Sequence, residues 1–299
     1  MSSLPAALLF DCDGTITSPE FLPYIVELTL REIAVKEGLV FDQEVFKRIF
    51  DAFKGGGFDK YYAGYFNAMA QGTVADKFGV ENFMVRAIDR YVKTLNDIRD
   101  GRIECQAFSI RPGVKDVMRR VAALGIPIAV VTNAATPVAR ANLGAGGIFE
   151  VGQAVPAHIS DPIIIDLLVD KSHYPDAAKD RKPSGFPYLY ACQRLGVHPA
   201  GCIGFEDSVN GHQSMVRARV GTRVHTAEED KASSLFFACD GGEEQPHFSL
   251  GWSELTLDVI DGIMEIHGTR LNGFKALNVL ASRIAEEVSK PLSEAPRPV

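Results

Sequence analysis

A short apolar segment at residues 6–10, which ends at two aspartates, constrains the fold of this chain more than any other feature. A segment this short and this apolar is typical of a strand that is buried on both faces of a parallel sheet. Open sheets of this kind bind ligands at the carboxyl ends of their strands, where Asp11 and Asp13 fall. Asp13-Gly14 could also be no more than a turn after a strand, so the rest of the chain decides between the two interpretations.

Strands and helices alternate in the second half of the chain. Further strands are predicted at residues 126–131, 201–205, 220–224 and 235–238. The spacing of apolar residues predicts helices at 111–124 and 186–195. This alternation predicts an α/β fold with a parallel sheet and right-handed crossovers. Residues 154–180 are interpreted as an irregular insertion and residues 241–244 as a loop.

The region between the first strand and this alternating part is predicted to be helical throughout. Apolar residues recur there at three- and four-residue spacing in the stretches 21–36, 41–53, 61–71 and 81–95. No strand-like alternation interrupts the region, so we expect a small helical insert. The same spacing predicts a helix over 271–288, and residues 291–299 are predicted to be a disordered tail.

The charge balance argues against two classes of partner. The 299 residues include 31 Lys and Arg against 38 Asp and Glu, a net charge of -7, with no basic block. Nucleic acid and membranes are therefore not expected partners. Five scattered cysteines without a C-x-x-C pair are typical of a reducing compartment, and no signal-peptide pattern is visible. We expect a cytoplasmic monomer or weak dimer, with import into an organelle left open.

A set of polar residues shares one position in this predicted fold, at the end of a strand or the start of a helix. The set is Asp11, Asp13, Thr132, Lys182, Glu206 and Asp207. If the strands are neighbours, these side chains converge. Close carboxylate pairs repel by about 4 kcal/mol at moderate dielectric, so such a cluster needs cations. Hard oxygen ligands without Cys or His select Mg²⁺, and Lys182 and Thr132 would complete a clamp for a phosphoryl group.

The two aspartates suit different tasks in phosphoryl transfer. A carboxylate can attack phosphorus and form an aspartyl-phosphate, and Asp11 is placed for that role. Asp13, two residues further on, is placed to protonate the leaving oxygen and later to activate water. The sequence therefore predicts phosphate-ester chemistry.

Four motifs in this order resemble those of the haloacid dehalogenase-like hydrolases. They are D-C-D-G-T at 11–15, V-V-T-N at 130–133, R-K-P at 181–183 and G-F-E-D-S-V-N-G at 204–211. The resemblance implies a Rossmann-like, doubly wound core formed by residues 1–17 and 109–290, with an inserted α-helical cap at 18–108.

The resemblance also implies roles for individual residues. Asp11 would be the nucleophile and Asp13 the acid/base, while Thr132, Asn133 and Lys182 would bind the phosphoryl group. The implied Mg²⁺ ligands are Asp11, the backbone carbonyl of Asp13, Asp207 and Glu206.

Within that family the chain is most similar to the β-phosphoglucomutases and CbbY-type phosphatases, which implies a small phosphorylated metabolite, such as a sugar phosphate or bisphosphate, as substrate. Glu20 lies where CbbY-type enzymes carry a substrate-facing Glu, although an exposed acid at a helix start explains it equally well. Lys54 precedes three glycines in a stretch that resembles the specificity loop of the cap, or a mobile hinge.

Two alternatives to a phosphatase stay open. The first is a sugar phosphomutase, but such enzymes carry a His shortly after the first motif, where this chain has Phe21-Leu22-Pro23-Tyr24. The second is a non-catalytic metabolite-binding protein, which would have no need of Asp13.

Overall fold

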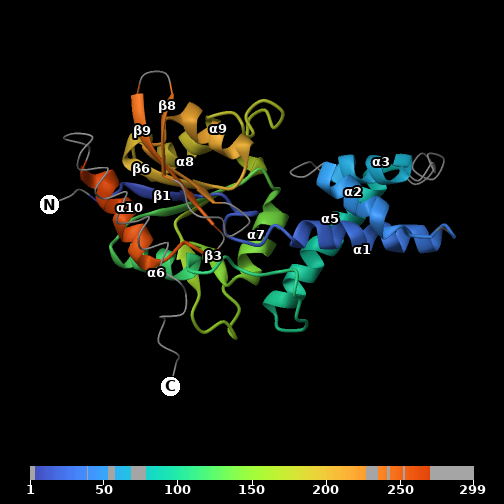
Figure 1. The fold of residues 1–299 in the computed structure, drawn as a ribbon. Helices are drawn as coiled ribbons and strands as arrows, with labels where there is room; N and C mark the ends of the chain where they lie inside the picture. Colours follow the sequence, from blue (N-terminus) through green and yellow to red (C-terminus); the bar gives the residue numbers. More distant parts are fainter. Residues whose placement is uncertain are drawn as a thin grey trace, which may run out of the picture. The chain divides into compact units, whose positions relative to one another are not determined.

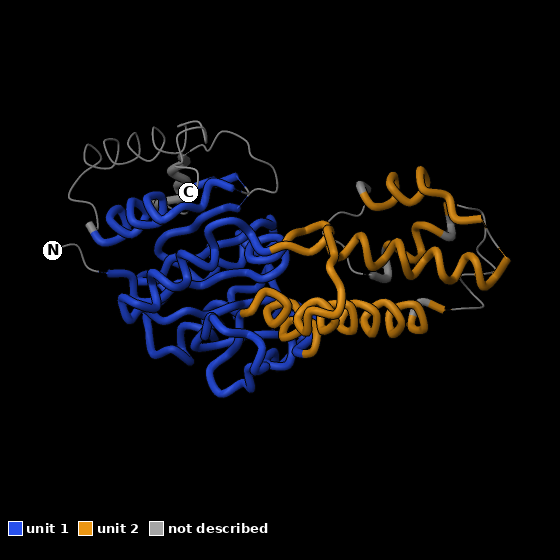
Figure 2. The backbone as a smooth tube through the Cα atoms, turned by 90° about the horizontal axis from the view of Figure 1, so that it is seen from below, with its two compact units in different colours: residues 1–17, 110–136, 148–299 blue, residues 18–109, 137–147 orange. Residues whose placement is uncertain are grey.

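The computed structural model describes residues 4–38, 40–52, 58–68, 79–226, 235–240, 243–251 and 253–269. Lys54, the predicted helix over 271–288 and the predicted tail at 291–299 lie outside the described residues. The chain divides into two compact units, drawn in different colours in Figure 2. One unit comprises residues 1–17, 110–136 and 148–299, and the other comprises residues 18–109 and 137–147.

A seven-stranded sheet forms the centre of the first unit, with the strand order β5-β2-β1-β6-β7-β9-β8 (Figure 1). The strands are β1 (Ala7–Phe10), β2 (Ile128–Val131), β5 (Leu167–Val169), β6 (Cys202–Glu206), β7 (Thr222–Thr226), β8 (Leu235–Asp240) and β9 (Glu243–Leu250). All neighbouring pairs are parallel except β8 and β9. Strands β3 (Ile148–Glu150) and β4 (Ile163–Ile165) form a separate parallel pair. The predicted α/β fold with a parallel, doubly wound sheet is confirmed.

Helices cover both faces of this sheet (Figure 1). Helices α8 (Phe186–Leu195) and α9 (Val209–Ala218) pack on each other, α8 against β1, β2 and β5 and α9 against β6 and β7. On the other face, α6 (Val114–Ala123) packs against β2 and against α10 (Leu257–Thr269). Two short 3₁₀ helices, η1 (Lys171–His173) and η2 (Pro199–Gly201), lie in the connections.

The alternation of side chains along β1 decides which way the first aspartate points. Ala7 and Leu9 are buried in a cluster with Tyr188 of α8, whereas Leu8 and Phe10 alternate with them and are equally buried. Because successive side chains in a strand point to opposite faces, Asp11 continues the series of Ala7 and Leu9. The first aspartate is therefore directed to the side of the sheet that α8 covers.

The second unit is helical. It contains α1 (Phe21–Lys36), α2 (Gln43–Ala52), α3 (Phe58–Ala68), α5 (Val80–Arg99) and most of α7 (Thr136–Ala145). Aromatic contacts hold these helices together, with the rings of Phe21 and Tyr91 4.8 Å apart and those of Tyr62 and Phe83 also 4.8 Å apart. In the described part of the chain, no helix has the length and apolar character needed to cross a bilayer.

Two predictions about connecting segments are wrong. Residues 154–180 are not an irregular insertion, because they contain β4 and β5, and β5 is an edge strand of the main sheet. Each of these strands has only three residues, which is too short for a periodic pattern to show. The predicted loop at 241–244 is also wrong in its second half, since β9 begins at Glu243 and pairs with β8.

Candidate active site

Three adjacent strands bring the predicted site residues of the first unit to one edge of the sheet. Phe10, the last residue of β1, pairs with Val130 on one side and with Phe205 on the other. Asp11 follows β1 and donates its backbone N–H to the Phe205 carbonyl at 2.9 Å. Thr132 follows β2 in the same way, and Glu206 is the last residue of β6. The carboxyl ends of β2, β1 and β6 thus carry the polar groups side by side.

Lys182 is the cation of this cluster. Its side chain is 4% exposed, and its ammonium donates to Asp11 Oδ1 at 2.5 Å, to the Val131 carbonyl at 2.7 Å and to Glu206 Oε1. These three bonds use all three donors of an ammonium group. Burial alone would lower the pKa of Lys182, but Asp11 and Glu206 outweigh that effect, so the pKa is raised and the group stays charged.

Asn133 holds the main chain of Lys182 rather than its side chain. The Lys182 backbone N–H donates to Asn133 Oδ1 at 3.0 Å, and Asn133 Nδ2 donates to the Lys182 carbonyl at 3.3 Å. Because the amide satisfies both backbone groups of one residue, it fixes the loop before α8 against the turn after β2. Thr132 is 2% exposed, and its hydroxyl accepts the backbone N–H of Ala134 at 3.1 Å.

Glu206 is fully buried and depends on two residues of the flanking helices. The Tyr188 hydroxyl donates to its Oε1 at 2.5 Å. At Gly211, on α9, an added Cβ would come within 1.8 Å of Glu206 Oε2, so only glycine leaves room for this carboxylate. Sequence reasoning missed Tyr188, since a tyrosine on an apolar helix is indistinguishable from a core residue.

Asp207 lies against the turn that contains Asp13. The backbone N–H of Gly14 donates to the Thr17 carbonyl at 2.8 Å, and this turn places Gly14 at φ +82°. A Cβ at that position would lie 2.1 Å from Asp207 Oδ2, so glycine is needed both for the turn and for the approach of the carboxylate. Asp13 itself is exposed to solvent.

The acidic groups have the composition of a site for a hard cation. Oxygen atoms of Asp11, Glu206 and Asp207 all lie within 4.8 Å of one another. Burial, reinforced by the charge of Asp11, raises the pKa of Glu206 to about 7, and the same two effects raise the pKa of Asp207 well above its usual range. Lys182 therefore does not neutralise all of the negative charge. Carboxylate oxygens without sulfur or nitrogen donors fit Mg²⁺.

The structure does not test the roles of the two remaining predicted site residues. Glu20 belongs to the helical unit, where it is exposed at the position before α1 and makes no side-chain capping hydrogen bond. Lys54 lies outside the described residues. Their predicted contacts with substrate stay predictions.

Comparison with known proteins gives one family match and several similar chains. The family described as haloacid dehalogenase-like hydrolase matches residues 5–219. A relative named "Putative phosphatase YhcW", from Bacillus subtilis, is 25% identical over 231 residues, which cover 77% of this chain and 87% of the relative.

Two solved structures have the same fold. CbbY from Rhodobacter sphaeroides, as a point mutant in complex with xylulose 1,5-bisphosphate, has a TM-score of 0.50 and 20% identity, covering 75% of this chain and 87% of that chain. A "putative beta-phosphoglucomutase" from Thermotoga maritima has a TM-score of 0.57 and 19% identity, covering 86% of this chain and 99% of that chain. At such identities the likeness establishes the fold.

Proposed function

Because this chain belongs to the haloacid dehalogenase-like hydrolases, as its four motifs predicted, we propose that it is an Mg²⁺-dependent phosphatase that forms an aspartyl-phosphate on Asp11. The chain is an enzyme of that family. The observation that carries the proposal is the buried bond between Lys182 and Asp11, 2.5 Å long, at the carboxyl end of the central strand.

Asp11 is suited to be the nucleophile because its surroundings fix its orientation. Lys182 holds Oδ1, and the backbone N–H of Asp11 is tied to β6. A carboxylate held in this way presents its other oxygen for in-line attack on phosphorus, and such positioning supplies much of the rate enhancement in phosphoryl transfer. Attack forms the Asp11 Oδ–P bond and breaks the bond from phosphorus to the ester oxygen. The positive charge of the buried Lys182 ammonium would offset the charge of the transferred group, and the hydroxyl of Thr132 would donate a hydrogen bond to it.

Asp13 is the residue that we assign to proton transfer. Its side chain is exposed and lies two residues from the nucleophile, outside the group of buried acids. As an acid it would give its proton to the leaving oxygen. As a base it would then take a proton from the water that attacks phosphorus and releases phosphate, leaving Asp11 free again. General acid–base steps of this kind contribute about 10²- to 10⁴-fold.

The residues that would hold Mg²⁺ are Asp11, Glu206, Asp207 and the backbone carbonyl of Asp13. When bound, the ion supplies positive charge that offsets the carboxylates and the phosphate. Tyr188 and Gly211 keep the Glu206 carboxylate in place for this task.

The substrate class that we propose is a small phosphorylated metabolite. A sugar phosphate or bisphosphate is supported by the likeness in fold to CbbY, whose structure contains a sugar bisphosphate. We propose that residues 18–108 act as the cap that selects the leaving group, with Glu20 and Lys54 facing substrate. We also propose a cytoplasmic protein, which the scattered cysteines favour, and a monomer or weak dimer.

The proposal is tested with an aryl phosphate, whose hydrolysis needs no specific leaving group. Asp11→Asn is expected to abolish Mg²⁺-dependent release of the aryl alcohol, whereas Asp116→Asn, an exposed acid on α6, is expected to retain it. Retained hydrolysis by Asp11→Asn contradicts the assignment of the nucleophile. Incubation of a hexose phosphate with catalytic bisphosphate then separates the phosphatase from the mutase, because a mutase isomerises the sugar without releasing phosphate.

A further inference from the structure

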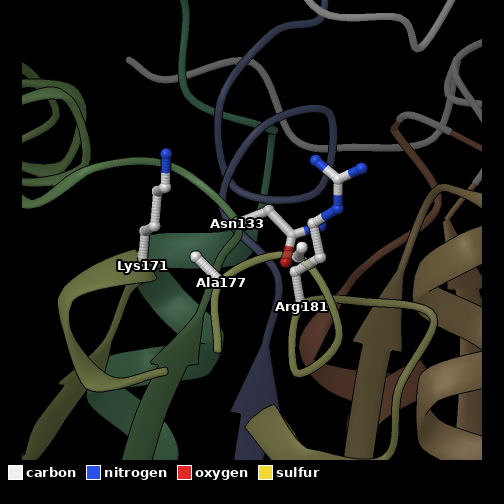
Figure 3. Close-up of a pocket in the computed structure, with 5 residues that line it drawn as sticks. Asn133, Lys171, Ala177 and Arg181 are labelled. Atoms are coloured by element: carbon white, nitrogen blue, oxygen red, sulfur yellow. The ribbon is translucent and has the colours of Figure 1, made fainter. Parts of the chain in front are cut away.

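A cavity of about 360 Å³ opens next to the turn that follows β2, on the same unit as the proposed catalytic residues. Its lining residues are Asn133, Lys171, Ala177, Ala178 and Arg181. Figure 3 shows Lys171 and Arg181 on either side of Asn133, with both charged ends directed away from the sheet. Cavities of about 300 to 1,000 Å³ are the usual size of sites for small molecules.

Hydrogen bonds to the turn after β2 fix the backbone on both sides of the cavity. The Lys171 backbone N–H donates to the Ala134 carbonyl at 3.0 Å. On the other side, Asn133 bonds to both main-chain groups of Lys182, the residue after Arg181. The Tyr174 hydroxyl donates to the Thr132 carbonyl at 2.5 Å. The turn that carries Thr132 therefore fixes the backbone from which the Lys171 and Arg181 side chains extend.

The acids nearest in sequence do not neutralise these cations. Asp170 is 1% exposed and accepts from the backbone N–H and the hydroxyl of Ser172 at 2.8 and 2.6 Å. Asp176 pairs with Lys179 at 3.0 Å. Asp180 accepts the backbone N–H of Asp176 at 2.8 Å.

Within the described part of the chain, Lys171 and Arg181 take part in no ion pair or side-chain hydrogen bond, although both are exposed. The cavity wall is therefore positively charged in a protein whose net charge is negative.

We propose that this cavity binds a second anionic group of the substrate, a phosphate or a carboxylate, while the scissile phosphate lies at Asp11 and Lys182. The proposal rests on the phosphatase function proposed above and narrows its substrate to phosphate esters with two anionic groups. Arg181 offers the planar fork that binds phosphate and carboxylate with two hydrogen bonds, and Lys171 adds a point charge opposite it. Ala177 and Ala178 also line the cavity, and their small side chains leave space for the anionic group between Arg181 and Lys171.

The test measures binding and does not need turnover. Asp11→Asn protein with Mg²⁺ is titrated calorimetrically with two matched pairs of probes: fructose bisphosphate against fructose monophosphate, and phosphoglycerate against glycerol phosphate. At least one two-anion probe is expected to bind about tenfold or more tightly than its partner, the effect of one or two charged hydrogen bonds. The pair that shows the advantage identifies the second group as phosphate or carboxylate.

Variants assign that advantage to the cavity. Lys171→Met and Arg181→Met, made singly and together in the Asp11→Asn protein, are expected to remove the advantage of the two-anion probe and to alter the one-anion probe much less. The matched control is Lys179→Met, which removes an exposed cation of the same loop that is already paired with Asp176. The control is expected to keep the full advantage.

Two outcomes overturn the proposal: equal binding of the probes in both pairs, or an advantage that survives the double variant. Its failure can be told from failure of the proposed function. If the unaltered chain hydrolyses aryl phosphate but the Asp11→Asn protein shows no two-anion advantage, only the cavity assignment is wrong. If the unaltered chain hydrolyses no phosphate ester, the proposed phosphatase function is wrong. The ratio of the affinities for the two-anion and one-anion probes then still decides whether the cavity recognises an anion.

Discussion

Ion pairs of the helical unit and of the active site both join carboxylates to basic side chains, but in opposite surroundings. On the helical unit, Glu32 of α1 pairs with Arg86 and Arg90 of α5, and these side chains are 46%, 41% and 29% exposed. At the active site, Lys182, Asp11 and Glu206 are 4%, 11% and 0% exposed. Water screens the first set and is excluded from the second.

The two sets therefore differ in their effect on the free energy of folding. Exposed pairs contribute less than about 1 kcal/mol each, so they can be exchanged freely. Buried charges lose several kcal/mol of hydration apiece, and apolar residues of similar volume often stabilise a protein more. A cluster with one cation and three buried or half-buried carboxylates is therefore explained by chemistry at the site rather than by stability.

The largest effect is expected from removing the central cation. Lys182→Met leaves Asp11 and Glu206 buried without their partner and is expected to lower the free energy of unfolding by about 3–5 kcal/mol. The matched change, Arg90→Met, removes a partner of exposed Glu32 and is expected to cost less than about 1 kcal/mol. Urea unfolding in the presence of a chelator measures both. Equal losses in the two variants contradict the distinction drawn between buried and exposed pairs.

A divalent cation is expected to stabilise the buried cluster and to leave the surface acids unaffected. At a hundredfold excess over its dissociation constant, Mg²⁺ raises the free energy of unfolding by about 2.7 kcal/mol. Asp207→Asn is expected to lose most of this gain, whereas Asp97→Asn, an acid paired with Lys93 on α5, is expected to keep it. Thermal unfolding with and without Mg²⁺ provides the measurement. A full gain in Asp207→Asn shows that the ion binds elsewhere.

A smaller effect is expected from the hydroxyl of Tyr188. Tyr188→Phe removes the donor that holds Glu206 and leaves a buried carboxylate with one hydrogen bond fewer, which is expected to cost about 1–3 kcal/mol. Tyr190→Phe, on the same helix, is the control and is expected to change stability little, because its ring packs on Phe186 and its hydroxyl makes no hydrogen bond to any residue that the structure describes. Urea unfolding compares the two. If both substitutions cost the same, the bond to Glu206 contributes nothing to the fold.

The smallest effect concerns pH and the surface acids. Hydrogen bonds from Lys93 and Arg102 lower the pKa of Asp97 below its ordinary value of 3.8. A lowered folded-state pKa contributes stability above the unfolded-state value, and this contribution is lost as the pH falls through the folded-state value. The melting temperatures of the unaltered chain and of Asp97→Asn should thus differ slightly near pH 6 and begin to converge only as the pH falls below about 4, toward the lowered folded-state pKa. A difference that grows on acidification contradicts this sign.

Sequence reasoning succeeded where a local pattern carries the structure. Helices α1 and α8 have the predicted bounds, because apolar spacing and flanking Gly or Pro mark their ends. The first strand was predicted because an uninterrupted apolar run ends at Asp11. Sequence reasoning failed at β5, because its three residues form a strand only by pairing with the edge of β2.

The candidate site also divides into features that a local pattern predicts and features that depend on tertiary contacts. The order of the motifs predicted which charged residues belong together, and the strand order β2-β1-β6 places three of their strands side by side. The partners of those residues could not be predicted. Tyr188 meets Glu206 because α8 begins shortly after Lys182 and turns this hydroxyl toward β6. Arg181 and Lys171 line one cavity because the main-chain groups of Lys182 and Lys171 bond to the turn after β2. Such contacts depend on tertiary geometry and leave no local pattern.

The most direct test of the proposed mechanism asks whether phosphate becomes attached to Asp11 during turnover. The unaltered chain, mixed with Mg²⁺ and an aryl phosphate and quenched rapidly with acid, is expected to yield a peptide phosphorylated on Asp11 by mass spectrometry, and Asp11→Asn is expected to yield none. Turnover that proceeds with no phosphorylated peptide, and that persists in Asp11→Asn, contradicts the assignment of this buried carboxylate as the nucleophile.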